Sequence, residues 1–108
     1  MITWNNLDTL EAFKNLSKAE RVNIAEAMSG ENGAERVKTY STPMAEGLAY
    51  NYAAKQVDDK LLEDLQKLAD EAQLTEKFEA LYNGEVINTG EKRMVLHHLT
   101  RGQLGEAV

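Results

Sequence analysis

The sequence contains no cysteine and only one proline among its 108 residues. Without cysteine the chain can form neither a disulfide nor a thiolate metal site, and it has no thiol nucleophile. Positive charge is also scarce, because 12 Lys and Arg stand against 18 Asp and Glu, for a formal net charge of -6. Nucleic acid and anionic membrane surfaces both require concentrated positive charge, so we expect neither as a partner.

Long hydrophobic runs are missing as well. The first residues, Met1–Asn6, have neither the basic region nor the apolar stretch of a signal peptide, and no run approaches the length of a membrane span. We therefore expect a cytoplasmic protein. Hydrophobic residues make up 43% of the chain and charged residues 28%, which is typical of a folded domain rather than a disordered segment.

Apolar residues recur at helical spacing through the first third of the chain. We predict a first helix over about 7–16, with four apolar residues at steps of three. Ser17 and Glu20 have the spacing of a capping box and predict the start of a second helix. Gly30 is the predicted stop of that second helix.

The clearest pattern predicts a third helix in the middle of the chain. Asp58 can cap it, and leucines then follow one face as far as Ala72, with charged residues opposite. Thr75 starts a brief fourth helix, which Asn83-Gly84 closes. After a polar break at 88–90, the spacing of apolar residues predicts a last helix over 94–99, ending at Gly102. The tail, 102–108, has no pattern of its own.

Between the second and third predicted helices, the residue pattern changes from helical spacing to a repeat of every second residue. Aromatic and small residues alternate over 48–53, which is a strand pattern, and 37–41 offers a partner strand. Pro43 and Gly47 bracket the predicted turn, while a helix over 44–54 is the alternative. The predicted fold class is therefore mainly α, with about five short helices and a small β-hairpin near residues 36–53.

Residues that could carry chemistry are few. His97 and His98 are adjacent, so a regular helix would point them about 100° apart, and they could not share a metal ion. We expect one of them to be partly buried and hydrogen-bonded, and the other to be exposed. We expect the acidic residues of the third helix to form a solvated face, because nothing in the pattern buries them (Glu63, Asp64, Asp70 and Glu71). No phosphate-binding glycine motif occurs, so the residues alone predict neither an active site nor a cofactor.

The segment 82–97 resembles a stretch typical of glucose-6-phosphate isomerases. In that family an aromatic residue is followed by x-G-E-K-I-N-x-T-E-x-R-A-V-L-H and then by A-L-R. Ten residues of this chain match in register: Gly84, Glu85, Ile87, Asn88, Glu91, Arg93, Val95, Leu96, His97 and Arg101. Upstream, 48–52 is similar to the family's apolar-x-x-D-Y strand, which also leads into a leucine-rich helix. The resemblance is strong over 48–101 and weaker before it.

The chain also departs from the family pattern at several positions. Gly90 stands where the family usually has Thr or Ser, and Met94 where it usually has Ala. Thr89 could replace the lost hydroxyl as a helix cap. These differences indicate a divergent member or a piece under relaxed constraint, and they leave the match intact.

The resemblance implies a larger enzyme that interconverts glucose 6-phosphate and fructose 6-phosphate without a metal or other cofactor. It implies that residues 1–108 are a single N-terminal helical domain, and that the catalytic groups lie in α/β sugar-isomerase domains C-terminal to it. It also implies an active homodimer. No catalytic or substrate-binding residue of the family falls on this chain, and six matching residues receive structural or positioning roles: Gly84, Asn88, Glu91, Arg93, His97 and Arg101.

Two functions follow from these observations. The first is an N-terminal domain or subunit of the isomerase, inactive alone, whose partners are the sugar-isomerase domains in cis or on a separate chain. The second is a free-standing helical interaction or dimerisation module that has lost those domains. An independent small enzyme is disfavoured, since no acid, base and phosphate site can be assembled from these residues.

Overall fold

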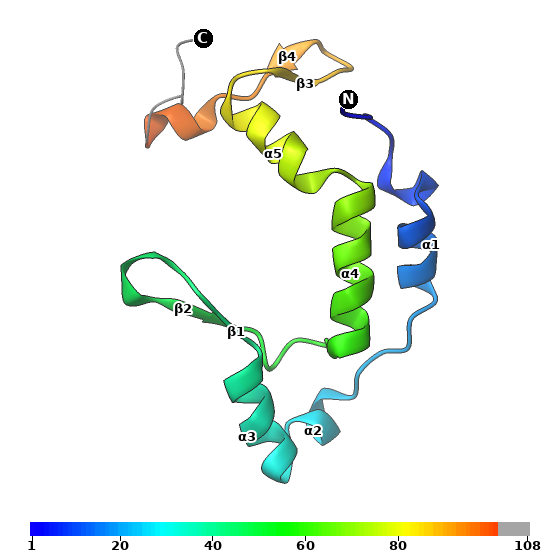
Figure 1. The fold of residues 1–108 in the computed structure, drawn as a ribbon, viewed down its shortest axis with the longest axis vertical. Helices are drawn as coiled ribbons and strands as arrows, with labels where there is room; N and C mark the ends of the chain where they lie inside the picture. Colours follow the sequence, from blue (N-terminus) through cyan, green and yellow to red (C-terminus); the bar gives the residue numbers. More distant parts are fainter. Residues whose placement is uncertain (102–108) are drawn as a thin grey trace. The chain divides into compact units, whose positions relative to one another are not determined.

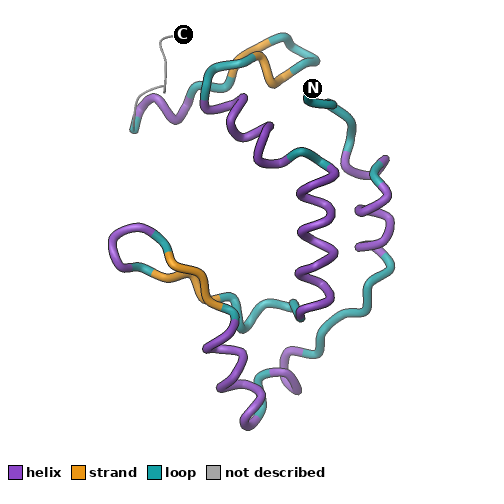
Figure 2. Tube along the Cα trace, in the orientation of Figure 1, coloured by secondary structure: helices purple, strands orange, loops and turns teal. Residues whose placement is uncertain are grey.

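A computed structural model describes residues 1–101, and their contacts divide the chain into two compact units. Unit 1 combines Met1–Ser17 with the described residues from Asp64 onward, and unit 2 is Lys18–Glu63. Helices dominate both units, and the strands of the described residues lie in two short hairpins (Figures 1 and 2). The mainly α fold class with five α-helices is therefore confirmed.

Unit 1 opens with a break in the first predicted helix. A 3-10 turn, η1 (Leu7–Thr9), precedes helix α1 (Glu11–Ser17), because Leu10 between them has an extended backbone. The predicted capping box was wrong, since Ser17 ends α1 and its hydroxyl donates a hydrogen bond back to the carbonyl of Lys14 at 2.7 Å.

Unit 2 begins its helical part later than predicted. Helix α2 (Ile24–Ala27) is capped by Asn23, whose side-chain oxygen accepts a hydrogen bond from the Glu26 N–H. Gly30 was predicted to end this helix, and that was wrong. It opens helix α3 (Gly30–Thr39) with a left-handed backbone, φ +59°.

Gly33 allows α2 and α3 to approach closely. A β-carbon built at this position would lie 2.2 Å from the carbonyl oxygen of Met28. That oxygen belongs to the backbone and cannot swing aside as a side chain would. Glycine is therefore required here by the close approach of two main-chain segments.

The predicted hairpin is confirmed, but one of its strands was misplaced. Strand β1 (Ser41–Pro43) pairs antiparallel with β2 (Ala49–Asn51), around a turn containing η2 (Ala45–Gly47). The prediction of a strand over 37–41 was wrong, because most of that segment forms the last turn of α3. Its β-branched residues favour a strand only weakly, and packing overrides such a preference.

The two central helices match the sequence closely. In α4 (Asp59–Glu71), Asp58 caps the start and its carboxylate accepts a hydrogen bond from the Leu61 N–H at 2.8 Å. Helix α5 (Leu74–Tyr82) starts one residue before the predicted position.

Helix α5 ends in the predicted Asn83-Gly84 stop. Gly84 has φ +79° and donates to the Leu81 carbonyl, while Glu85 donates to the Ala80 carbonyl. This pair of bonds is a Schellman motif, which satisfies carbonyls that the helix end would otherwise leave free.

The last predicted helix was wrong. The chain instead forms a hairpin of β3 (Val86–Asn88) and β4 (Arg93–Met94), followed by a 3-10 turn, η3 (His97–Thr100). Short apolar runs fit a strand as well as a helix, which is why spacing alone failed here. The predicted stop at Gly102 and the tail lie outside the described residues.

The core of the described chain is built from small side chains. Its buried hydrophobic residues are four alanines and one tyrosine: Ala12, Tyr40, Ala53, Ala72 and Ala80. No large side chain within residues 1–101 is completely buried, and many large apolar ones are exposed. None of the helices in this range combines the length and the apolar character needed to cross a membrane.

Candidate functional site

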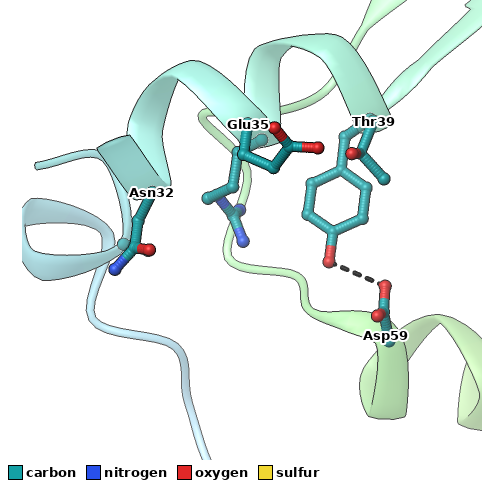
Figure 3. Close-up of a pocket in the computed structure, with 7 residues that line it drawn as sticks. Asn32, Glu35, Thr39 and Asp59 are labelled. Atoms are coloured by element: carbon teal, nitrogen blue, oxygen red, sulfur yellow. Dashed lines mark hydrogen bonds between the residues drawn. The ribbon is translucent and has the colours of Figure 1, made fainter. Parts of the chain in front are cut away.

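One pocket of the described residues lies within unit 2 (Figure 3). It encloses about 370 Å³ between α2, α3 and the first turn of α4. Most of the residues that line it have polar or charged side chains, and the lining residues are Ala27, Asn32, Glu35, Arg36, Thr39, Tyr40 and Asp59. The pocket therefore contains two acids, one guanidinium and one phenol.

Tyr40 and Asp59 form the hydrogen bond drawn in Figure 3. The buried Tyr40 hydroxyl donates to the Asp59 carboxylate at 2.9 Å and ties the end of α3 to the start of α4. Burial, and next the bond to this carboxylate, raise the pKa of Tyr40 above its ordinary value. The phenol is thus held protonated and is poorly suited to act as a general base at neutral pH.

Arg36 is also occupied in holding the chain together. Its Nε and Nη2 donate to the Ala53 carbonyl at 3.1 and 2.8 Å, and Nη2 also donates to the Lys55 carbonyl at 3.2 Å. The guanidinium carbon lies 4.7 Å from the centre of the Tyr40 ring, within cation–π range. This arginine therefore fixes the segment after β2 against α3.

A second, smaller hollow of about 280 Å³ lies within unit 1. Around it the end of α4 holds the N-terminal chain. The Gln73 side chain accepts from the Thr3 N–H at 2.7 Å and donates to the Met1 carbonyl at 3.0 Å. The Glu71 carboxylate accepts from two consecutive N–H groups of α1, those of Glu11 and Ala12, at 3.0 and 2.8 Å.

The acidic face predicted on α4 is only partly solvated. Glu63 and Asp70 are exposed, as expected, but the expectation was wrong for Asp64, which is only 8% exposed. Glu71 is exposed and yet serves as the acceptor for α1. The sequence pattern could not show this role, because the partners of Glu71 are about sixty positions away.

Four of the six matching family residues lie in the turn after α5 and in the β3–β4 hairpin: Gly84, Asn88, Glu91 and Arg93. Gly84 provides the left-handed residue of the helix stop. Asn88 and Glu91 pair across the hairpin turn: the Asn88 Nδ2 donates to the Glu91 carboxylate at 3.1 Å, and the Glu91 N–H donates to the Asn88 Oδ1 at 3.2 Å. Gly90 lies in this turn and not at the start of a helix. The helix cap expected there is therefore not needed.

Arg93, in β4, is exposed, and so are the two remaining matching residues, His97 and Arg101. The expected division between the two histidines is confirmed, with His97 exposed and His98 partly buried. The His98 ring stacks on Tyr82 with centroids 5.0 Å apart, and its Nε2 lies 3.0 Å from the Tyr82 carbonyl oxygen. The other ring nitrogen, Nδ1, is buried and has no hydrogen-bond partner among the described residues.

The polar groups of both hollows mainly hold backbone segments in place. Within residues 1–101 no three acidic or histidine side chains are grouped so that they could hold a metal ion. The geometry supports a structural part of a protein better than a self-contained catalytic centre.

Comparison with known proteins gives a consistent result. The family model described as phosphoglucose isomerase matches residues 51–108. The glucose-6-phosphate isomerase of Treponema denticola is 54% identical over 106 residues, which are 94% of this chain and 20% of the relative. That of Treponema pallidum (strain Nichols) is 46% identical over 93% of this chain and 19% of the relative.

A third relative extends the match to the whole chain. The glucose-6-phosphate isomerase of Borreliella afzelii is 42% identical over 100% of this chain and 20% of the relative. This chain thus spans about a fifth of the length of the curated relatives it matches. No solved structure gives a significant match.

Proposed function

Because this chain belongs to the phosphoglucose isomerase family, we propose that it forms the N-terminal helical part of a glucose-6-phosphate isomerase. The observation that carries the proposal is the near end-to-end match to enzymes of that name, which are about five times longer than the matched segment. In the proposed whole enzyme, glucose 6-phosphate and fructose 6-phosphate are interconverted. Residues 1–108 then act as one N-terminal domain.

The chain alone is inactive in this proposal, and its partners are the sugar-isomerase domains, in cis or on a separate chain. The hydrogen bonds of Arg36, Tyr40 and Glu71 support an inactive chain, because each side chain holds backbone groups or a neighbouring helix in place. The catalytic acid and base, with the sugar-phosphate site, then belong to the sugar-isomerase domains. The proposed enzyme needs no cofactor.

The matching residues have structural and positioning roles in this proposal. Gly84 stops α5, and Asn88 with Glu91 fixes the hairpin turn that follows. Arg93, His97 and Arg101 are exposed on the segment that leads out of the described chain, which suits contacts with a following domain. The enzyme is further proposed to be a cytoplasmic homodimer.

The test is the intact mass of the endogenous protein, obtained with an antibody against this segment and mass spectrometry, together with an isomerase assay of the same material. A product several times larger than 12.1 kDa that converts fructose 6-phosphate to glucose 6-phosphate is expected. A 12.1 kDa product that co-purifies with sugar-isomerase domains and activity would also support the proposal, as a split enzyme.

The second candidate is the free-standing interaction module, which the many exposed large apolar side chains also favour. It predicts a 12.1 kDa product that co-purifies with no isomerase activity. That result would refute the isomerase proposal, so the same experiment separates the two functions.

A further inference from the structure

Asparagine is followed directly by glycine at two places in the chain, 32–33 and 83–84. This dipeptide is chemically reactive, because glycine has no β-carbon to shield its backbone nitrogen or to restrict its rotation. Once deprotonated, that nitrogen can attack the side-chain amide carbon of the preceding asparagine. Because the same dipeptide occurs twice, the two sites differ mainly in what the fold does to each of them.

Asn32 is held inside a helix. It is the third residue of α3, and the Gly33 N–H donates to the Ser29 carbonyl at 3.3 Å. The attack requires the Asn32 ψ angle to leave its helical value, which would break α3 in its first turn. Gly33 is also buried, and the Met28 backbone lies directly against it. Hydroxide therefore has little access to the Gly33 N–H, and the main chain has no room to turn.

Asn83 lies at a helix end instead. It is exposed and is the C-cap of α5, with φ -83° and ψ 3°. The Gly84 N–H donates to the Leu81 carbonyl at 3.1 Å, so the presence of a hydrogen bond does not distinguish the two sites. Gly84 is only partly buried, however, and its φ of +79° already lies outside the helix. Turning the Asn83 ψ angle opens only the last bonds of α5, and helix ends open at a small cost in free energy.

We propose that Asn83 is a site of spontaneous deamidation in the folded protein, whereas the fold protects Asn32. The Gly84 nitrogen loses its proton to hydroxide and bonds to the Asn83 Cγ. The Cγ–Nδ2 bond breaks, and Nδ2 leaves as ammonia with a proton from water. Water then opens the five-membered succinimide at either of its carbonyls, giving aspartate or isoaspartate. The net reaction consumes one water and releases one ammonia, and it does not depend on the proposed function.

Either product weakens the end of α5. Both carry a negative charge at neutral pH, close to the helix C-terminus, where the helix dipole is also negative. Isoaspartate in addition lengthens the main chain by a carbon atom just before Gly84. The Gly84 and Glu85 N–H groups then lose their alignment with the Leu81 and Ala80 carbonyls. The modification therefore loosens the helix stop that leads into the β3–β4 hairpin.

The test is peptide mapping by mass spectrometry of the intact protein after incubation at mildly alkaline pH, either folded in buffer or unfolded in urea. Digestion at acidic pH prevents further deamidation, and electron-transfer fragmentation separates isoaspartate from aspartate. In urea the two sites should convert at similar rates, because glycine follows both. In the folded protein Asn83 should convert at least about tenfold faster than Asn32. Equal rates in the folded protein would overturn the proposal, and so would an Asn83 that stays unchanged while the urea sample converts.

A matched pair of variants tests the consequence for the helix stop. Long incubation should lower the thermal midpoint of the unmodified protein by several degrees. Asn83→Gln should prevent this loss, since glutamine would have to close a six-membered ring, which forms far more slowly. Asn32→Gln should not prevent it. A loss that Asn83→Gln leaves unchanged would refute the effect on α5. The site itself is decided by the rates in unmodified protein, whether or not either variant folds.

Discussion

Glu71 caps a helix that lies 59 positions earlier in the sequence: its carboxylate accepts a hydrogen bond from the Ala12 N–H at 2.8 Å. Figure 1 shows α1 beside the end of α4 that carries this residue. The first N–H groups of a helix have no partner within it, and a negative charge at that end is favourable. The Glu71 carboxylate on α4 therefore caps the start of α1, a role that a side chain next to the helix start usually has.

Glu71→Ala should lower the free energy of unfolding by about 1–3 kcal/mol, because two charge-assisted hydrogen bonds to backbone donors are lost. Urea denaturation measures the change. Glu63→Ala is the matched control on the same helix, since Glu63 is exposed and should be neutral within about 0.5 kcal/mol. Equal effects of the two substitutions would contradict the capping role.

Gly33→Ala should destabilise the protein by at least about 2 kcal/mol, because the new methyl group would overlap the Met28 carbonyl. The control is Gly90→Ala, whose β-carbon would meet the Asn88 Oδ1 at an ordinary 3.7 Å. That change should be neutral within about 0.5 kcal/mol. A thermal unfolding series of both variants tests the contrast, and a tolerated alanine at position 33 would refute the close approach.

Tyr40 should make stability fall at alkaline pH. Burial and the bond to Asp59 raise its pKa in the folded protein above the unfolded value of about 10. The folded state then holds the proton longer than the unfolded state, so this contribution is complete below about pH 10 and is lost as pH rises through the folded pKa.

Unfolding curves between neutral and strongly alkaline pH would test the Tyr40 contribution. Tyr40→Phe should be less stable by about 1 kcal/mol at neutral pH, through the lost hydrogen bond, and should show a shallower alkaline decline. Tyr50→Phe is the control, because Tyr50 is exposed, and its decline should match that of the unmodified chain. Identical alkaline slopes in all three proteins would rule the contribution out.

Asn88 and Glu91 should behave as one unit. Asn88→Ala removes both bonds of the pair and should cost about 1 kcal/mol. In that background Glu91→Ala should cost almost nothing further, so the double variant should be more stable than the sum of the single changes predicts. A double-mutant cycle on unfolding free energies measures the coupling, and strictly additive costs would show that the pair is not formed.

His98 and His97 should differ sharply despite being neighbours. His98→Ala loses the stack on Tyr82 and the bond to its carbonyl and should cost about 1 kcal/mol or more. His97→Ala changes an exposed side chain and should stay within about 0.5 kcal/mol of the unmodified protein. Chemical denaturation of both variants measures the loss of unfolding free energy. A larger loss for His97→Ala than for His98→Ala would contradict the structure.

Elements governed by signals a few residues apart could be predicted from the sequence. The Asp58 cap reaches Leu61 three positions on, and the Gly84 stop bonds back within α5, so both signals are local. The wrong prediction of a helix cap at Ser17 has a local cause as well. Asn23 and Glu26 form a second signal of the same spacing, and the structure uses that one.

The features that sequence reasoning missed depend on distant partners. Glu71 has the position of an ordinary solvated acid on α4, and only the placement of α1 gives it a function. The hairpin after α5 was missed for a different reason: its strands are two and three residues long, too short for periodicity to separate strand from helix. The family resemblance was confirmed over that same segment, because matching residues requires no correct secondary structure.

The stacked tyrosines provide the two units with separate spectroscopic reporters. Tyr40, Tyr52 and Tyr50 stack in sequence within unit 2, with neighbouring ring centres 5.4 and 5.9 Å apart. The single tryptophan of the chain, Trp4, belongs to unit 1 and lies against Lys77. Tryptophan fluorescence therefore follows the melting of unit 1, while the near-ultraviolet dichroism of the tyrosine stack follows unit 2. Coincidence of the two curves would reveal one cooperative transition without any added label.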